Sequence, residues 1–421
     1  MKDKKLIGPI TQLLSMDQLP VKGAIKDSQL PILKHAGILL DGDKIVEIGD
    51  FEILRKKIDL QEVRRIDLSE NYVALPGMID CHTHICFAGS RAKDFALRNS
   101  GKSYLEIAES GGGIWDTVTQ TRKMSGSELA KITASRADQL LENGITTIEV
   151  KSGYGLSVLE EIKMLTSIHQ ANRKTKADLI ATCLAAHLLP KDFEGDETAY
   201  LDWMVQKLLP ILYKEGLSKR VDIFIEKSAF SKEQALVYLK KAKEIGFQIT
   251  VHADQFTSGG SEVAVKMQAL SADHLEASSE EDLKRLAKSD TIGVALPGAS
   301  IGLGCPFTPA RKLLDMGGSL AIASDWNPGS APMGDLLTQA SILATFEKLS
   351  TTEVFAGITF RAAAALGLTN RGTIAAGQYA DFILFPTSDY QEILYHQGNM
   401  KPAQVWKSGL KVFDRKKKMK S

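Results

Sequence analysis

The sequence lacks long apolar runs and is poor in cysteine, and each shortage excludes a class of protein. No stretch approaches the roughly 20 apolar residues that span a bilayer, and the N-terminal segment lacks the apolar core of a signal peptide. We therefore expect a cytoplasmic protein without a membrane anchor. Its four cysteines, Cys81, Cys86, Cys183 and Cys305, follow neither a zinc-finger nor a CxxC spacing, so we expect reduced thiols instead of disulfides.

A surplus of charge of one sign is also missing. Lysine and arginine number 52 and aspartate and glutamate 51, which leaves a formal net charge of +1. Such a balance gives no electrostatic attraction to nucleic acid or to an anionic membrane, so we expect a small-molecule substrate. The 421 residues exceed one ordinary hydrophobic core and predict one large domain with a smaller one. For the assembly we expect a homodimer, the commonest state of soluble oligomers.

From Leu75 onward the chain alternates short apolar segments with longer helical patterns. Eight segments have the composition of buried parallel strands, and they span residues 78–84, 146–151, 178–187, 221–227, 247–253, 270–274, 291–296 and 319–325. Helical patterns lie between them, as after Ser125, which is a suitable N-cap for a helix that Gly144 would terminate. Eight strand–helix units predict an α/β fold, the (β/α)8 TIM barrel.

Both ends of the chain have a different pattern. The first 74 residues alternate β-prone runs with turns, and Asp41, Gly42 and Asp43 lie between two apolar stretches as a hairpin requires. After the barrel segment, GTIAAGQYADFILFP and QVWKSGLKVFD return to short β-prone runs. We predict that residues 1–74 and 369–421 together build a small β-sandwich beside a barrel of residues 75–368.

Histidines and one aspartate gather at the predicted strand ends. His82 and His84 end the first strand, and a strand's period of two sends both side chains to the same face. His252 ends the fifth strand, His274 the sixth and Asp325 the eighth. The carboxyl ends of barrel strands form the face on which barrel enzymes assemble their sites. We therefore predict that these side chains meet.

This set of side chains predicts a metal-dependent hydrolase. Imidazole and carboxylate ligands without thiolate suit Zn²⁺ or Fe, and an incomplete set of protein ligands leaves room for water. A metal ion in such a site activates that water as a nucleophile. Asp325 is our candidate for the base that takes the remaining proton and passes it to a leaving nitrogen, and His274 would orient or polarise the carbonyl under attack.

A family resemblance runs over nearly the whole chain. The motifs that carry it are PGMIDCHTH, SRAKDFALR, SYLEIAESGGGI, EVKSGYGL, AAHLLP, VHADQ, SADHLE, DWNPGS and GTIAAGQYADFILF. In these motifs the chain resembles the imidazolonepropionases of the amidohydrolase superfamily, and GGGI, KSGYGL and DWNPGS are narrower signals than HxH. The resemblance implies cleavage of the cyclic amide C–N bond of 4-imidazolone-5-propanoate, which gives N-formimidoyl-L-glutamate in histidine degradation.

The resemblance also implies roles for individual residues. One Zn²⁺ or Fe ion per subunit would be held by His82, His84, His252 and Asp325. The substrate pocket would be lined by Arg91, Tyr154, His187, Gln255, Asn327, Gly329 and Ser330. The guanidinium of Arg91 would offer a bidentate fork to the substrate carboxylate. The predicted catalytic residues are Asp325, His274 and Gln255.

Two residues keep alternative functions open. Related deaminases have a glutamate where this chain has Gln255, and an amide does not shuttle protons at neutral pH, which favours Asp325 as the base. Binuclear relatives place a carboxylated lysine near Lys227, although a surface lysine is the simpler interpretation. The alternatives are another cyclic amidase or aminohydrolase (deaminase) of the superfamily, with one metal ion or two, and a catalytically inactive barrel that acts as a binding protein.

Overall fold

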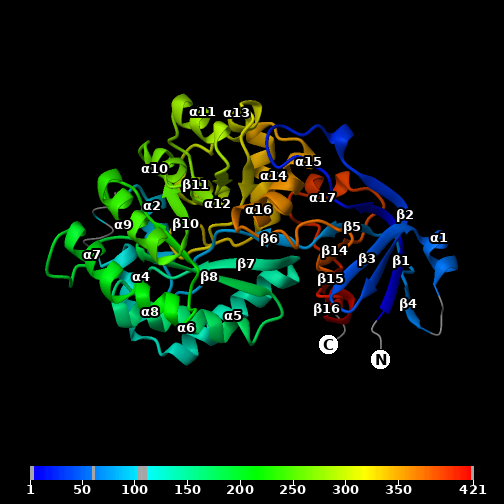
Figure 1. Cartoon of the computed structure of the whole chain (residues 1–421), viewed down its shortest axis with the longest axis horizontal. Helices are drawn as coiled ribbons and strands as arrows, with labels where there is room; N and C mark the ends of the chain where they lie inside the picture. The colour runs from blue at the N-terminus through cyan, green and yellow to red at the C-terminus, as the bar shows by residue number, and fades with distance from the viewer. Residues whose placement is uncertain (1–3, 59–61, 103–105, 107–110, 419–421) are drawn as a thin grey trace.

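The structure is a computed structural model that describes residues 4–58, 62–102, 106 and 111–418. Within the motif SYLEIAESGGGI, residues 103–105 and 107–110 therefore lie outside the described part of the chain. The described residues form two sheets that lie side by side, a barrel surrounded by helices and a smaller sheet (Figure 1). None of the helices in the described ranges combines the length and the apolar character needed to cross a membrane.

The barrel contains all eight predicted strands in chain order. Neighbouring strands are parallel, and the strands are β6 (Met78–Asp80), β7 (Ile145–Lys151), β8 (Asp178–Ala186), β9 (Arg220–Ile223), β10 (Gln248–Ala253), β11 (Ser271–His274), β12 (Ile292–Ala295) and β13 (Leu320–Ile322). The first and last strands meet just beyond their ends, where the Asp325 amide donates to the His82 carbonyl (3.1 Å) and the His84 amide to the Trp326 carbonyl (3.0 Å). This contact brings the two ends of the barrel sheet together.

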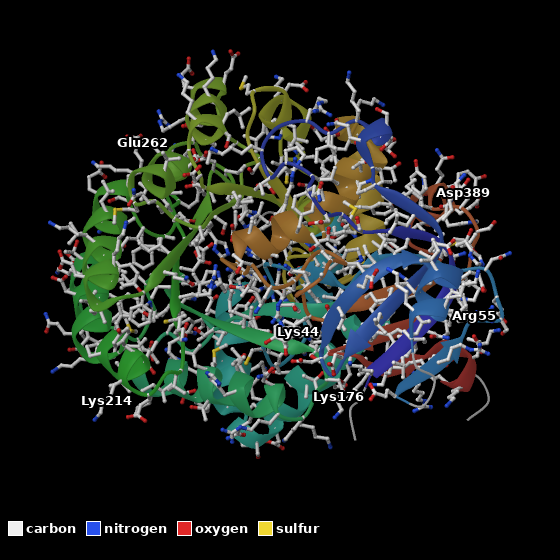
Figure 2. The ribbon with its side chains drawn as sticks, turned by 45° about the vertical axis from the view of Figure 1, so that its right-hand side comes forward. Lys44, Arg55, Lys176, Lys214, Glu262 and Asp389 are labelled. Atoms are coloured by element: carbon white, nitrogen blue, oxygen red, sulfur yellow. The ribbon has the colours of Figure 1, made fainter. Side chains whose placement is uncertain are left out.

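Helices cover the outside of the barrel, and several of them bury one face against its strands. In α5 (Gly126–Glu142), Ser125 and Glu128 form a capping box, and the buried positions from Leu129 to Leu141 recur at helical spacing. The helices around the barrel are α2 (Ala92–Asn99), α4 (Ile114–Lys123), α5, α6 (Val158–Asn172), α7 (Glu197–Lys207), α8 (Leu209–Lys214), α9 (Lys232–Ile245), α10 (Gly260–Lys266), α11 (Glu280–Lys288), α12 (Pro297–Leu303), α13 (Ala310–Asp315), α14 (Leu336–Glu347), α15 (Thr351–Gly357) and α16 (Phe360–Ala365). Charged side chains such as those of Lys176, Lys214 and Glu262 lie on the outer surface (Figure 2).

The second sheet combines both ends of the chain, as the sequence predicted. Its strands are β1 (Lys4–Leu14), β2 (Ile32–Asp41), β3 (Lys44–Asp50), β4 (Val63–Asp67), β5 (Val73–Pro76), β14 (Phe382–Phe385), β15 (Gln404–Lys407) and β16 (Leu410–Asp414). The predicted hairpin joins β2 to β3, with Asp41 opposite Lys44 and Gly42 at φ 60°. β5 and β14 pair antiparallel, and residues from both chain ends, such as Ile10, Ile38 and Phe382, share one buried core.

Short peripheral helices and a group of ion pairs complete the small sheet. The helices are η1 (Asp27–Gln29), α1 (Phe51–Lys57), α17 (Gln391–Tyr395) and α18 (Arg415–Lys418). Lys407 of β15 is buried and contacts Asp178 of the barrel strand β8 (2.7 Å) and Asp381 (2.6 Å). Arg371 also pairs with Asp178. These contacts fasten the small sheet to the outer end of β8.

Candidate active site

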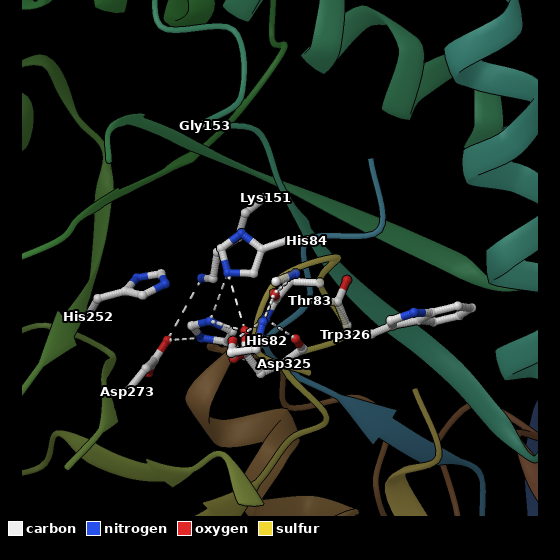
Figure 3. A network of polar contacts seen from close by, with 12 residues as sticks. His82, Thr83, His84, Lys151, Gly153, His252, Asp273, Asp325 and Trp326 are labelled. Atoms are coloured by element: carbon white, nitrogen blue, oxygen red, sulfur yellow. Dashed lines mark hydrogen bonds and ion pairs between the residues drawn. The ribbon is translucent and has the colours of Figure 1, made fainter. Parts of the chain in front are cut away.

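A buried group of three histidines lies where the barrel strands end. His82 and His84 follow β6, and His252 lies in β10; each side chain is almost completely buried. One nitrogen from each ring lies within 4.8 Å of the others, and the His82 and His84 Nε2 atoms are 3.3 Å apart. Asp325 Oδ1 lies 3.5 Å from His82 Nε2 and 3.4 Å from His84 Nε2 (Figure 3). The four side chains that the sequence predicts as metal ligands are therefore together.

The protonation of these histidines suits metal binding. Burial lowers the pKa of His82 and of His84 well below the ordinary value, and it lowers the pKa of His252 to about 4. All three rings are therefore neutral near pH 7. His82 Nδ1 lies 2.6 Å from an oxygen of Asp273, and His252 Nδ1 lies 2.9 Å from an oxygen of Asp222.

These contacts also decide which ring nitrogen is free. A ring nitrogen Nδ1 that faces a carboxylate carries the proton of its imidazole. The Nε2 lone pair of that imidazole then points into the histidine group. The His84 Nε2 atom lies 3.3 Å from His82 Nε2 and either donates to it or, when the His84 proton is on Nδ1, directs a second lone pair into the same space. A cation between them satisfies both, so the donor set fits a metal ion such as zinc.

Asp325 is held in a strained backbone conformation beside the histidines. Its φ is 51°, in the left-handed region that non-glycine residues rarely adopt, and His274 has a φ of 88°. Such positions cost about 1–3 kcal/mol each and cluster at functional sites. Burial raises the pKa of Asp325 to about 6, whereas His274 opposes this shift. A carboxyl with this pKa can accept and release a proton near neutral pH.

The turn after Asp325 brings Asn327, Gly329 and Ser330 together. The Asn327 side chain donates to the Asp325 carbonyl and to Ser330 Oγ (both 2.8 Å), and it accepts from the Gly329 amide (2.7 Å) and the Ser330 amide (2.8 Å). Arg91 reaches this turn: a Cβ added to Gly329 would lie 3.4 Å from Arg91 Nη1. The Arg91 guanidinium therefore lies beside the backbone of Gly329.

A second loop places Tyr154 and His187 beside the histidine group. The His187 ring is stacked on that of His84, with centroids 5.8 Å apart, and the Tyr154 ring lies 6.0 Å from His84. His187 Nδ1 lies 2.9 Å from the Gly153 carbonyl, which orients the imidazole. Burial lowers the pKa of His187 to about 4, so its ring is neutral as well.

The structure also gives the positions of His274, Gln255 and Lys227. The His274 ring, at the end of β11, lies 5.8 Å from the His82 ring and 5.3 Å from the His252 ring. Gln255 is half-buried, two residues beyond β10. Lys227 is exposed because β9 ends at Ile223 and the chain turns before it reaches this position. An exposed lysine does not bridge metal ions in a buried site, so the binuclear alternative that relies on Lys227 does not hold.

The structure also brings in charged residues that the sequence analysis did not select. Glu161 accepts hydrogen bonds from the amides of Gly153, Gly155 and Leu156 and so shapes the loop that carries Tyr154. Arg98 donates to the Gly329 carbonyl (3.3 Å). The largest group lies behind the histidines and consists of Glu149, Lys151, Asp222 and Asp273. The available signal was a charged residue inside an otherwise apolar strand, because such charges are buried only in pairs.

Comparisons with known proteins show the family of this chain. A profile of the amidohydrolase family matches residues 73–412. The imidazolonepropionase of Bdellovibrio bacteriovorus is 39% identical over 413 residues, which covers 97% of this chain and 96% of that protein. The imidazolonepropionase of Idiomarina loihiensis is 40% identical over 381 residues, which covers 90% of this chain and 93% of that protein.

A solved structure shows the same fold at much lower identity. The atrazine chlorohydrolase of Arthrobacter aurescens, in complex with zinc, superposes with a TM-score of 0.70 at 17% identity and covers 97% of this chain and 95% of that protein. The similarity therefore extends through both the barrel and the small sheet. From the family profile and the full-length identity, this chain belongs to the amidohydrolase family and, within it, to the imidazolonepropionases.

Proposed function

We propose that this chain hydrolyses the ring amide of 4-imidazolone-5-propanoate to N-formimidoyl-L-glutamate, with one Zn²⁺ or Fe ion per subunit. The carrying observation is the full-length identity of 39% to a protein named imidazolonepropionase. The assembled site supports the same proposal, since the four predicted ligands, His82, His84, His252 and Asp325, lie together. Zinc in the structurally similar atrazine chlorohydrolase supports zinc as the ion.

The side chains around the ligand group suit this reaction. When bound, the metal ion polarises a carbonyl and lowers the pKa of a water molecule. Asp325 takes a proton from the attacking water as its oxygen adds to the ring carbonyl carbon. His274 stands beside the group to hydrogen-bond the carbonyl oxygen, on which negative charge develops. The carbon–nitrogen bond then breaks, and Asp325 returns the proton to the departing nitrogen.

The substrate carboxylate would bind between Arg91 and the Asn327–Ser330 turn. Arg91 Nη1 lies near Gly329, and the Arg91 Nε atom is paired with Asp94, which fixes the guanidinium plane. Asp94 also accepts a hydrogen bond from the Gly113 amide (2.8 Å), so the GGGI segment braces the same arginine. This arrangement explains how an anionic tail is held while the ring lies over the histidines.

We predict that Arg91→Lys raises KM by about tenfold with little change in kcat. A lysine keeps the charge but loses the fork, and one charged hydrogen bond is worth about 1.5–3 kcal/mol. Steady-state kinetics on the substrate and on its uncharged propanamide analogue check this. The parent enzyme should have a much lower KM for the carboxylate than for the propanamide, and the variant only a slightly lower one. Equal KM values in parent and variant would remove Arg91 from the pocket.

The function itself is tested by following the ultraviolet absorbance of freshly generated imidazolone propanoate. We expect rapid loss of absorbance with metal-loaded protein, none after chelation, and recovery when Zn²⁺ or Fe²⁺ is restored. If protein that holds one metal ion leaves the absorbance unchanged, the substrate assignment is wrong, and other cyclic amides and aminoazoles become the candidates. Failure to bind any transition metal would instead favour the inactive barrel.

We further propose that the protein acts in the cytoplasm as a homodimer on a free small molecule, without a nucleic-acid or membrane partner. The balanced formal charge of +1 supports the absence of a polyanionic partner. Light scattering of the purified protein determines the oligomeric state.

A further inference from the structure

One lysine lies at the centre of the charged group behind the histidines. The Lys151 side chain is 1% exposed, and its Nζ atom lies 2.8 Å from Glu149 Oε1, 2.8 Å from Asp222 Oδ2 and 3.8 Å from Asp273 Oδ2. All three carboxylates are as deeply buried as the lysine. A single ammonium group therefore faces three carboxylates in a buried region of the barrel.

Two of these carboxylates also contact predicted metal ligands. Asp273 Oδ2 lies 2.6 Å from His82 Nδ1, and Asp222 Oδ2 lies 2.9 Å from His252 Nδ1. A carboxylate at Nδ1 fixes the tautomer and the plane of a ligand imidazole. The same two oxygens are those closest to Lys151, so the lysine and the histidines share them.

The third carboxylate connects the lysine to the HxH segment. Glu149 Oε2 accepts a hydrogen bond from the amide of Thr83, the residue between His82 and His84 (3.2 Å). The Thr83 hydroxyl donates in turn to the Glu149 carbonyl (2.6 Å). Lys151 is thus connected through one carboxylate each to His82 and His252, and through Glu149 to the backbone of the residue before His84.

Electrostatics explains why a cation is needed at this position. Glu149, Asp222 and Asp273 are all buried, and the Lys151 Nζ atom lies within 3.8 Å of an oxygen of each of them. Without the ammonium group, three buried carboxylates would repel one another, and neutral acids are poorer acceptors for the imidazole N–H groups.

We propose that Lys151 is a positioning residue for the metal centre: it holds Glu149, Asp222 and Asp273 in the arrangement that directs His82, His84 and His252 toward one ion. The proposal rests on the metal site of the proposed function but not on the identity of the substrate. Lys151 is neither a predicted ligand nor a predicted pocket residue, so we expect its removal to act on metal affinity and on ligand geometry.

The test compares Lys151→Met with Lys407→Met. Lys407 is a matched control because it is also a buried lysine between carboxylates, Asp178 and Asp381, but it lies in the small sheet. Zn²⁺ affinity is measured by competition with a chromophoric chelator, without substrate. We expect Lys151→Met to weaken Zn²⁺ binding by about 10–100-fold, the usual effect of losing an outer-shell partner, and Lys407→Met to lower thermal stability only.

A spectroscopic readout separates positioning from general destabilisation. The visible spectrum of the Co²⁺-substituted protein reports ligand geometry, and we expect it to change in Lys151→Met and to stay unchanged in Lys407→Met. Parent-like Zn²⁺ affinity and Co²⁺ spectrum in folded Lys151→Met would overturn the proposal. Because neither measurement uses imidazolone propanoate, a wrong substrate assignment would leave this result intact.

A second variant keeps the proposal testable if Lys151→Met does not fold. Asp273→Asn keeps the shape of the side chain and removes one of the buried charges that Lys151 holds beside His82. We expect it to fold and to weaken Zn²⁺ binding by about tenfold or more. Unchanged Zn²⁺ affinity in Asp273→Asn would show that the path from Lys151 to His82 does not matter.

Discussion

Asp325→Asn should lower kcat by about 10³-fold in folded protein that has been loaded with metal. General acid–base catalysis contributes about 10²–10⁴-fold, and an asparagine of the same shape accepts no proton at neutral pH. Asp325 is the candidate because its carboxylate lies 3.4 Å from His84 Nε2 and burial raises its pKa to about 6. Turnover of imidazolone propanoate by variant protein of measured metal content checks the prediction.

The stability of the metal-free Asp325→Asn protein provides the control. In the folded protein the pKa of Asp325 is about 6, above the ordinary 3.8, so ionisation of this carboxyl opposes folding. The stability that the protonated carboxyl contributes is therefore lost as the pH rises through that interval. The asparagine carries no such penalty. We therefore expect the metal-free variant to melt no earlier than the parent at pH 8. Near-normal kcat with metal bound would exclude Asp325 as the base.

His84→Ala should remove the metal ion and with it all turnover. His84 is the cleanest ligand to delete, because its Nδ1 atom has no hydrogen-bond partner among the residues that the structure describes. Removing His82 would instead leave Asp273 without its imidazole contact. Losing an outer-shell partner weakens metal binding by up to about 100-fold, and losing a direct ligand should weaken Zn²⁺ binding by more than that. Chelator competition and elemental analysis measure this loss.

His187→Ala is the matched control for His84→Ala. The His187 ring is stacked on that of His84 with centroids 5.8 Å apart, but it is not one of the three histidines that converge on a common point. We expect the His187 variant to keep its metal and to bind substrate more weakly. Equal metal loss in the two variants would contradict the assignment of His84 as ligand and His187 as pocket residue.

Local sequence pattern was enough to predict the architecture. Each barrel strand is a short apolar run between helical segments, and a strand's alternation of faces places His82 and His84 on the same side. The barrel rule then brings His252, His274 and Asp325 to the same face, since the carboxyl ends of parallel strands coincide. These inferences depend on periods of two and 3.6 residues, which the sequence displays directly.

The assembly of the site depended on information that periodicity does not contain. Only the tertiary structure shows that Lys227 is exposed, because the fourth barrel strand ends at Ile223, four residues before the end of the predicted strand 221–227. The approach of Arg91 to Gly329 joins residues more than two hundred positions apart and depends on the docking of two loops. Loop docking follows from packing and hydrogen bonds over the whole molecule, which no local pattern encodes.

The buried charges also show the difference between what the sequence determines and what only the tertiary structure decides. The sequence displays Glu149, Lys151, Asp222 and Asp273 as isolated charges in apolar strands, and it determines that each requires a partner. Which partners they have follows from the order and stagger of β7, β9, β10 and β11 around the barrel, because ion pairing is significant only within a few ångströms. The sequence by itself therefore determined the barrel, the positions of the ligands along it and the family, whereas the closed barrel alone decided how one lysine and three carboxylates orient the histidines.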